Sequence, residues 1–233
     1  MLGRAFAWLA ARARAEEADL ARESGAEEAA NAITHGIGAG LALVALVLGV
    51  IYAARTGSAW AIVATAIYGV TLLFLFSVST FYHALVRPGP KRLFLALDHC
   101  AIFLLIAGTY TAVALSTMHG LWQGWVMLGV VWGLAIAGIV LRLAWLRYMH
   151  PLFIALYVVM GWVGFAFADA VEATIGRQGI ELMIIGGVCY TGGIVLYALR
   201  RLPFNHALWH LAVIAGAVVH FLAVYEHVIP RAA

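Results

Sequence analysis

The chain carries seven long apolar segments that are separated by short polar connections. The segments lie near residues 33–54, 59–85, 93–115, 121–141, 152–168, 180–199 and 206–229. Each is long enough for a helix to cross a hydrocarbon core of about 30 Å, and helices satisfy their own backbone hydrogen bonds in lipid. The pattern predicts an all-α integral membrane protein, a bundle of seven transmembrane helices.

The composition agrees with this prediction, because 65% of the 233 residues are hydrophobic and only 11% are charged. A soluble domain of this length could not bury so much apolar surface. Residues 1–28 are too charged for a span or a signal peptide. We expect them to form an N-terminal cytoplasmic segment, either an interfacial amphipathic helix or a partly disordered tail, ahead of a transmembrane domain at 29–233. Cys100 and Cys189 lie inside apolar segments and are expected to be free thiols.

The basic residues are distributed unevenly between the two sides of the predicted bundle. Eleven fall in the N-terminal segment and in the second, fourth and sixth connections, whereas three, Arg55, Arg177 and Arg231, fall on the other side. Basic residues favour the cytoplasmic side, so we expect an inside N-terminus and an outside C-terminus in the cell inner (plasma) membrane. The net charge of +3 does not indicate nucleic-acid binding, because these residues lie in short loops. Membrane lipids are the expected partners, and the sequence is compatible with a homo-oligomer.

The last apolar segment opens with His206-Ala-Leu-Trp-His210, a pair of histidines four residues apart. Four residues of helix place both imidazoles on one face, roughly 6 Å apart along the axis. This is a common way for one helix to offer two metal ligands. The predicted topology places His83 and Asp98, from two other helices, at a similar depth near the inner side. Ionisable side chains are costly there and often mark function.

Three imidazoles and one water would form an open zinc site of the catalytic kind. Asp98 could hold that water or accept its proton, and a metal is the only cation expected near this carboxylate. Ser79 lies on the His83 face of its helix, whereas His99 is expected to point away from the site. A polar network without metal remains the alternative. Two pairs of small residues, Gly36/Gly40 and Gly129/Gly133, are expected to allow close helix packing.

Three motifs in this order resemble those of a known family. They are Glu28-Ala-Ala-Asn31-Ala-Ile-Thr-His35, Ser79-Thr-Phe-Tyr-His83 with Asp98 in the next segment, and His206-Ala-Leu-Trp-His210. The chain resembles the bacterial haemolysin III branch of the progestin and adiponectin receptor family, which is more distantly related to the alkaline ceramidases. The resemblance implies zinc held by His83, His206 and His210, with Asp98 reaching the metal through water and Ser79 beside it.

The remaining polar residues leave alternatives open. His35 could cap its helix, support a metal ligand or be structural. His220 and His227 share one stripe of the last segment and could form a second, outer site with Glu226.

Three functions are compatible with these features. The first is a metal-dependent hydrolase of lipid amides or esters in membrane lipid homeostasis, with Asp98 and Ser79 as catalytic residues. The second is a receptor or regulator of membrane state with structural zinc, and the third is a pore-forming haemolysin with cytolytic activity. Polar residues gather at the inner end rather than along the full height of the helices, which argues against a simple channel.

Overall fold

The computed structural model describes residues 23–144 and 150–232, and these residues form helices and no strand. Residues 1–28 were expected to form a separate segment, but 1–22 lie outside the described residues. The α-helices are α2 (Gly25–Arg55), α3 (Ala59–Ala84), α4 (Pro88–Thr117), α5 (Trp122–Ala144), α6 (His150–Trp162), α7 (Ala168–Ala198) and α8 (Asn205–Ala223). Shorter helical turns are η1 (Val163–Phe167), η2 (Val224–Val228) and η3 (Ile229–Arg231).

Two helices, α2 and α4, begin earlier than the apolar pattern alone predicts. Ser24 caps α2, because its hydroxyl accepts a hydrogen bond from the Glu27 backbone N–H at 3.3 Å while the Glu27 carboxylate accepts one from the Ser24 N–H at 3.0 Å. This reciprocal capping box starts the helix before residue 29, the predicted domain boundary. α4 begins at Pro88, since proline suits the first helical turn. Lys91 and Arg92 therefore lie in α4 rather than in a loop.

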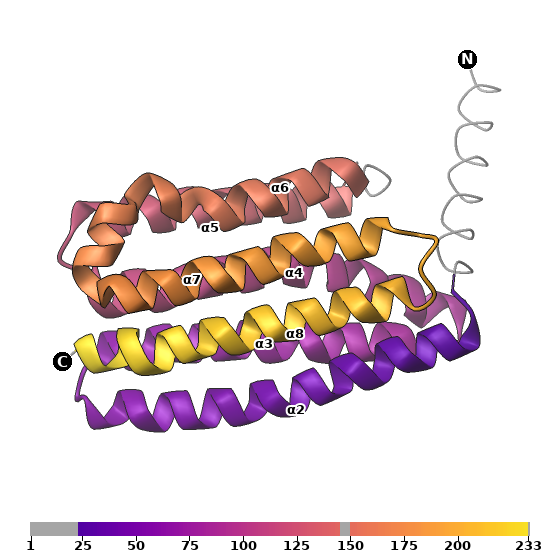
Figure 1. The fold of residues 1–233 in the computed structure, drawn as a ribbon, viewed down its shortest axis with the longest axis horizontal. Helices are drawn as coiled ribbons and strands as arrows, with labels where there is room; N and C mark the ends of the chain where they lie inside the picture. The colour runs from indigo at the N-terminus through magenta and orange to yellow at the C-terminus, as the bar shows by residue number, and fades with distance from the viewer. Residues whose placement is uncertain (1–22, 145–149, 233) are drawn as a thin grey trace, which may run out of the picture.

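Six stretches of the described residues are long and apolar enough to cross a membrane, whereas the sequence predicted seven. The difference lies in one stretch of 48 residues, Pro151–Ala198, which the apolar pattern divides into 152–168 and 180–199. This stretch is not one straight rod. α6 ends in the 3-10 turn η1, and α7 contains the non-helical Gly176, whose φ of +78° suits glycine. The chain turns back here, so that the long part of α7 runs beside α6 (Figure 1). Trp162 Nε1 donates to Thr191 Oγ1 across this contact at 3.1 Å.

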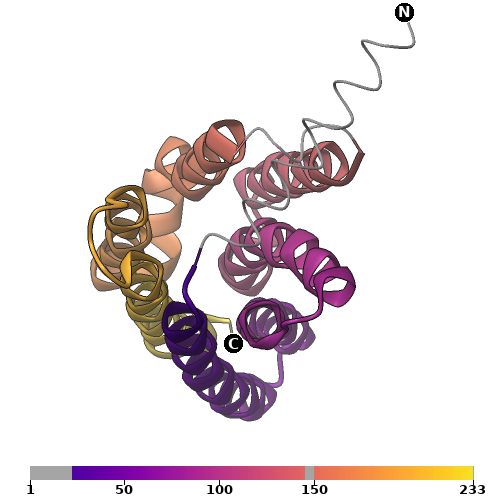
Figure 2. The same ribbon diagram turned by 90° about the vertical axis from the view of Figure 1, so that its right-hand side faces the viewer.

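Viewed end-on, the helices follow one another around a ring in chain order, and α8 returns to α2 (Figure 2). The outward face of α2 carries large apolar side chains at every third or fourth position, which is the expected pattern for a lipid-facing helix surface. These exposed residues are Ile33, Ile37, Leu41, Val44, Leu48 and Ile51.

Of the four glycines predicted to allow close packing, only Gly36 would bring a Cβ atom within 4 Å of a neighbouring helix, at 3.7 Å from Thr80 of α3. A Cβ atom on Gly69 of α3 would lie 3.0 Å from the backbone Cα of Leu46 on α2. By contrast, a Cβ on Gly40, Gly129 or Gly133 would meet nothing within 4 Å. These three glycines are exposed on the outer face of the bundle, so the prediction that they serve helix packing is wrong within the described chain.

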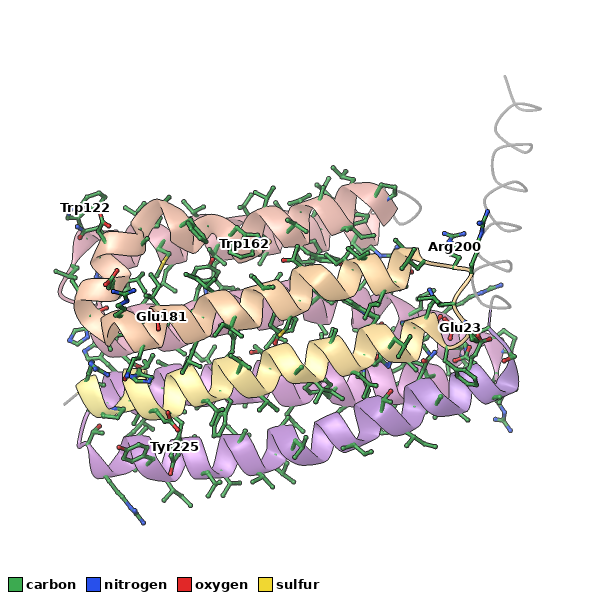
Figure 3. All side chains as sticks on the ribbon, in the orientation of Figure 1. Glu23, Trp122, Trp162, Glu181, Arg200 and Tyr225 are labelled. Carbon is green, nitrogen blue, oxygen red and sulfur yellow. The ribbon has the colours of Figure 1, made fainter. Side chains whose placement is uncertain are left out.

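The candidate site residues predicted from the sequence lie at one end of the bundle. The starts of α2, α4, α6 and α8 meet the ends of α3, α5 and α7 at this end (Figure 1). Glu23 and Arg200 lie at this end, whereas Trp122 and Tyr225 lie at the opposite one (Figure 3).

Candidate metal centre

Three imidazoles from two helices come together at this end of the bundle. His83 lies in the last turn of α3, and His206 and His210 lie in the first two turns of α8. One ligand atom from each residue lies within 4.8 Å of the others. The ring centroids are 4.8 Å apart for His83 and His206, 4.6 Å for His206 and His210, and 5.1 Å for His83 and His210. The structure therefore brings together the three residues that the sequence singled out.

Two glutamates from the start of α2 hold two of these imidazoles. His83 Nδ1 lies 2.7 Å from Glu28 Oε2, and His206 Nδ1 lies 2.5 Å from Glu23 Oε1. The second oxygen of Glu23 accepts a hydrogen bond from the Asn31 side-chain amide. A carboxylate at Nδ1 makes this nitrogen the donor, which leaves Nε2 as the free ligand atom. His83 Nε2 is buried and has no hydrogen-bond partner among the described residues.

The third imidazole, His210, is held by α2 without a carboxylate. Its Nδ1 lies 3.3 Å from the Asn31 carbonyl oxygen and 3.2 Å from Thr34 Oγ1. The His35 ring stacks on it with a centroid distance of 3.4 Å and an interplanar angle of 11°, and Phe76 packs edge-on against His35. His35 thus contacts a candidate ligand directly, which favours a supporting role over a capping one.

The connection before α8 sets the direction of His206. Phe204 adopts a left-handed conformation with φ of 55°, and its N–H lies 3.4 Å from Glu27 Oε1. Few residues other than glycine and asparagine adopt this conformation. The Asn205 side-chain amide donates to the Tyr197 carbonyl at 2.7 Å. These contacts tie the start of α8 to the start of α2 and to the end of α7, so that the first turn of α8 faces α2.

An apolar cavity of about 220 Å³ adjoins the histidine cluster. Glu23, Asp98 and His206 line the cavity together with apolar side chains of α4, α6, α7 and α8. His99 also lines this cavity but belongs to neither group of clustered ligand atoms in the described chain. Its Nδ1 donates to the Leu95 carbonyl at 2.7 Å. Asp98 belongs to neither group of clustered ligand atoms in the described chain, and therefore lies beside the three imidazoles rather than among them.

The surroundings of Asp98 differ in one respect from the prediction. Arg142 is buried at the end of α5, lies close enough to Asp98 to attract its carboxylate, and has its Nη2 3.4 Å from His99 Nδ1. A metal is therefore not the only cation available to Asp98. The prediction missed this cation because α5 extends to Ala144, past the predicted end at 141, so that Arg142 lies in the helix rather than in a loop. Ser79 is buried one turn before His83, and its hydroxyl lies near Asp98 without a hydrogen bond of ordinary geometry.

The outer histidines do not form a second cluster among the described residues. His220 Nε2 donates to the Met183 carbonyl at 2.9 Å, whereas His227 lies 4.0 Å from Glu226. Neither histidine belongs to a group of ligand atoms in the part of the chain that the structure describes.

The sequence did not predict which side chains support the histidines. These side chains are Glu23, Glu28 and Lys91. The available signals were the Glu28 position within the first motif and the Ser24/Glu27 capping pair, which marks the true helix start. That start places both glutamates beside the histidines. The partners themselves follow only from the arrangement of the helices.

Comparison with known proteins identifies the class of this membrane protein. The family described as haemolysin-III related matches residues 24–221. The chain is 41% identical over 206 residues to hemolysin-3 of Bacillus cereus, covering 88% of this chain and 94% of the relative. It is 40% identical over 198 residues to the hemolysin-3 homolog of Bacillus subtilis (strain 168), covering 85% and 92%. A more distant relative is the adiponectin receptor protein of Drosophila melanogaster, 29% identical over 180 residues that cover 67% of this chain and 40% of the relative.

The chain belongs to the haemolysin-III related family, and the resemblance drawn from the motifs is confirmed. With its apolar helices, it is a multi-pass membrane protein. The described residues contain a histidine cluster, with neighbouring glutamates, that could hold a metal ion.

Proposed function

We propose that the protein is a zinc-dependent hydrolase of lipid amide or ester bonds that acts in membrane lipid homeostasis. One observation carries the proposal. Three imidazoles, each with its Nδ1 already held by a carboxylate or a carbonyl, lie beside an apolar cavity whose wall includes Asp98. A purely structural polar network would have no need of an adjoining apolar cavity.

The donor set supports zinc. His83, His206 and His210 would hold the ion through their Nε2 atoms and leave a fourth position open, as in catalytic zinc sites. When bound, zinc would polarise a carbonyl and lower the pKa of a water molecule to about 7. Asp98 would orient the attacking water and accept its proton. Ser79 would donate a hydrogen bond to the developing oxyanion, and the cavity would hold the lipid chain away from water.

We place the site in the inner half of the cell inner (plasma) membrane. In this arrangement α6 with η1 and the long part of α7 are two separate spans, which gives seven transmembrane helices with an inside N-terminus and an outside C-terminus. Residues 1–28 would be cytoplasmic, and 29–233 would form the transmembrane domain. Membrane lipids would be the partners of this site, and nucleic acid would not.

Metal analysis of the purified protein tests the proposal. We expect about one zinc per chain, with a strong loss of zinc in His210→Ala and in His206→Ala. His119→Ala is the matched control, because His119 is an exposed histidine on the far side of the bundle. Lipid profiles of membranes with wild-type protein should show a lipid amide or ester consumed, and membranes with His206→Ala should not. Undiminished zinc after all three ligands are replaced by alanine would place the metal elsewhere.

A second candidate, a pore-forming haemolysin, is suggested only by the names of the family and of its Bacillus relatives. Leakage from dye-loaded vesicles distinguishes the two. Release that persists in His206→Ala, without lipid cleavage, would favour the pore.

A further inference from the structure

Lys91 is the only lysine of this chain, and it is buried at the histidine end of the bundle. Only 7% of its surface is exposed, although it lies in the first turn of α4, where its neighbour Arg92 is exposed. Its Nζ lies 2.6 Å from Glu28 Oε1 and 5.0 Å from the ring centroid of Tyr82. A lysine at a helix start would ordinarily reach solvent, so its burial here requires an explanation.

The explanation lies in the carboxylate that Lys91 contacts. Glu28 uses one oxygen for the Lys91 ammonium and the other for His83 Nδ1, at 2.6 Å and 2.7 Å. The chain Lys91–Glu28–His83 thus connects α4, α2 and α3. Charge-assisted hydrogen bonds of this kind are stronger and more directional than neutral ones. The buried ammonium and the half-buried carboxylate each compensate the desolvation of the other.

The position of Lys91 also affects whether a metal ion would bind to Glu28. Glu23, Glu28 and His83 form a second group whose ligand atoms lie within 4.8 Å of one another, which could hold a metal ion by geometry alone. The Lys91 ammonium already supplies positive charge to Glu28 in this group. Glu28 therefore remains an acceptor for His83 rather than a metal ligand.

We propose that Lys91 is a positioning residue of the metal centre, which fixes Glu28 so that His83 presents its Nε2 to the metal. This inference rests on the proposed function, because it assumes that His83, His206 and His210 bind a metal. Outer partners of metal-bound histidines change metal affinity by about 10–100-fold when they are removed. Lys91 lies one residue further out, so its removal should act through Glu28.

Metal affinity, measured on the full-length protein in detergent by zinc competition with a chelator, tests the inference. Lys91→Met keeps the length of the side chain but removes the charge, and should weaken zinc binding about 10-fold. Lys91→Arg should restore binding to within about threefold of wild type, because a guanidinium can also donate to Glu28. Arg87→Met is the matched control, since it removes an exposed positive charge one turn earlier at the same end of the bundle, and should leave zinc binding unchanged. Wild-type affinity in Lys91→Met would overturn the inference.

A double-mutant cycle separates positioning from folding. In a Glu28→Gln background, Lys91→Met should weaken zinc binding no further, since its effect passes through that carboxylate. Additive losses would show that Lys91 acts on general stability instead and would overturn the proposal. Cobalt absorption gives a second readout, because a changed ligand geometry in Lys91→Met alters the visible bands while a merely destabilised protein keeps them. If wild-type protein binds no zinc at the three histidines, the proposed function itself fails. If it binds zinc and Lys91→Met binds equally well, only the positioning role fails.

Discussion

Asp98 differs from the three histidines in both position and surroundings. It lies on the cavity wall outside the group of clustered ligand atoms, and it has Arg142 as a neighbouring cation. Attraction to Arg142 would explain a carboxylate at this depth, and so would a role in orienting a catalytic water. The two reasons make different predictions for the loss of the negative charge.

We expect Asp98→Asn to stay folded and to keep most of its zinc, but to lose lipid hydrolysis. The amide preserves the shape of the side chain but cannot accept the proton of an attacking water. Zinc content and product formation should be measured on the same preparation. Asp169→Asn, an exposed carboxylate on the other side of the bundle, is the control. Full activity in Asp98→Asn would reject the role as general base, and joint loss of zinc and activity would make Asp98 a ligand.

At the scale of single residues, the sequence located the three histidines but not their partners. The four-residue spacing of His206 and His210 defines one helix face, and the alternating direction of the helices brings His83 to the same depth. Simple helix geometry is therefore enough to predict that the three histidines lie together. The contacts of Glu23 and Glu28 depend on how the start of α2 packs against α3 and α8. Helix periodicity carries no information on that packing.

At the scale of elements, the helices themselves follow from the apolar pattern, whereas their contacts do not. The spacing of Gly129 and Gly133 predicts a packing face, but that face points outward in the structure. Gly69 has no glycine four residues away and yet lies directly against α2. Which side of an apolar helix faces lipid is weakly encoded, because lipid and protein interior are similarly apolar. By contrast, the turn at Gly176 lies in a polar connection that carries Asp169, Glu172 and Arg177, and for this reason the apolar pattern divides Pro151–Ala198 into two segments.

Gly69→Ala should destabilise the protein by about 1–3 kcal/mol, because the new methyl group would press on the Leu46 backbone and force α2 and α3 apart. Thermal unfolding in detergent would show this as a lower midpoint. Gly129→Ala is the paired control, since its methyl group would meet nothing within 4 Å, and it should be neutral. Equal midpoints for Gly69→Ala and wild type would mean that the two helices are not in such close contact.

At the scale of the whole molecule, the two ends of the bundle are chemically unlike. The histidine end holds Glu23, Glu28, Lys91 and Arg142 beside the imidazoles, and the cavity extends from it among apolar side chains. A lipid entering from the bilayer could therefore place its polar group at the histidines while its chain stays in apolar surroundings. Under the proposed function, the orientation of the protein decides which leaflet supplies the lipid.

Membrane topology provides the last prediction, and it decides between six and seven spans. The N-terminal segment and the second, fourth and sixth connections carry eleven basic residues against three in the others, and this excess predicts that their side is inside. If α6 with η1 and the long part of α7 cross separately, reporters fused after Arg55 and Gly176 should report outside, and those after Arg92, Arg147 and Arg201 inside. A reporter at the C-terminus should then lie outside. If Pro151–Ala198 crossed only once, the signals after Arg201 and at the C-terminus would both be reversed, while the one after Arg92 would not. An outside signal after Arg92 would instead invert the whole bundle and move the histidine cluster to the outer leaflet.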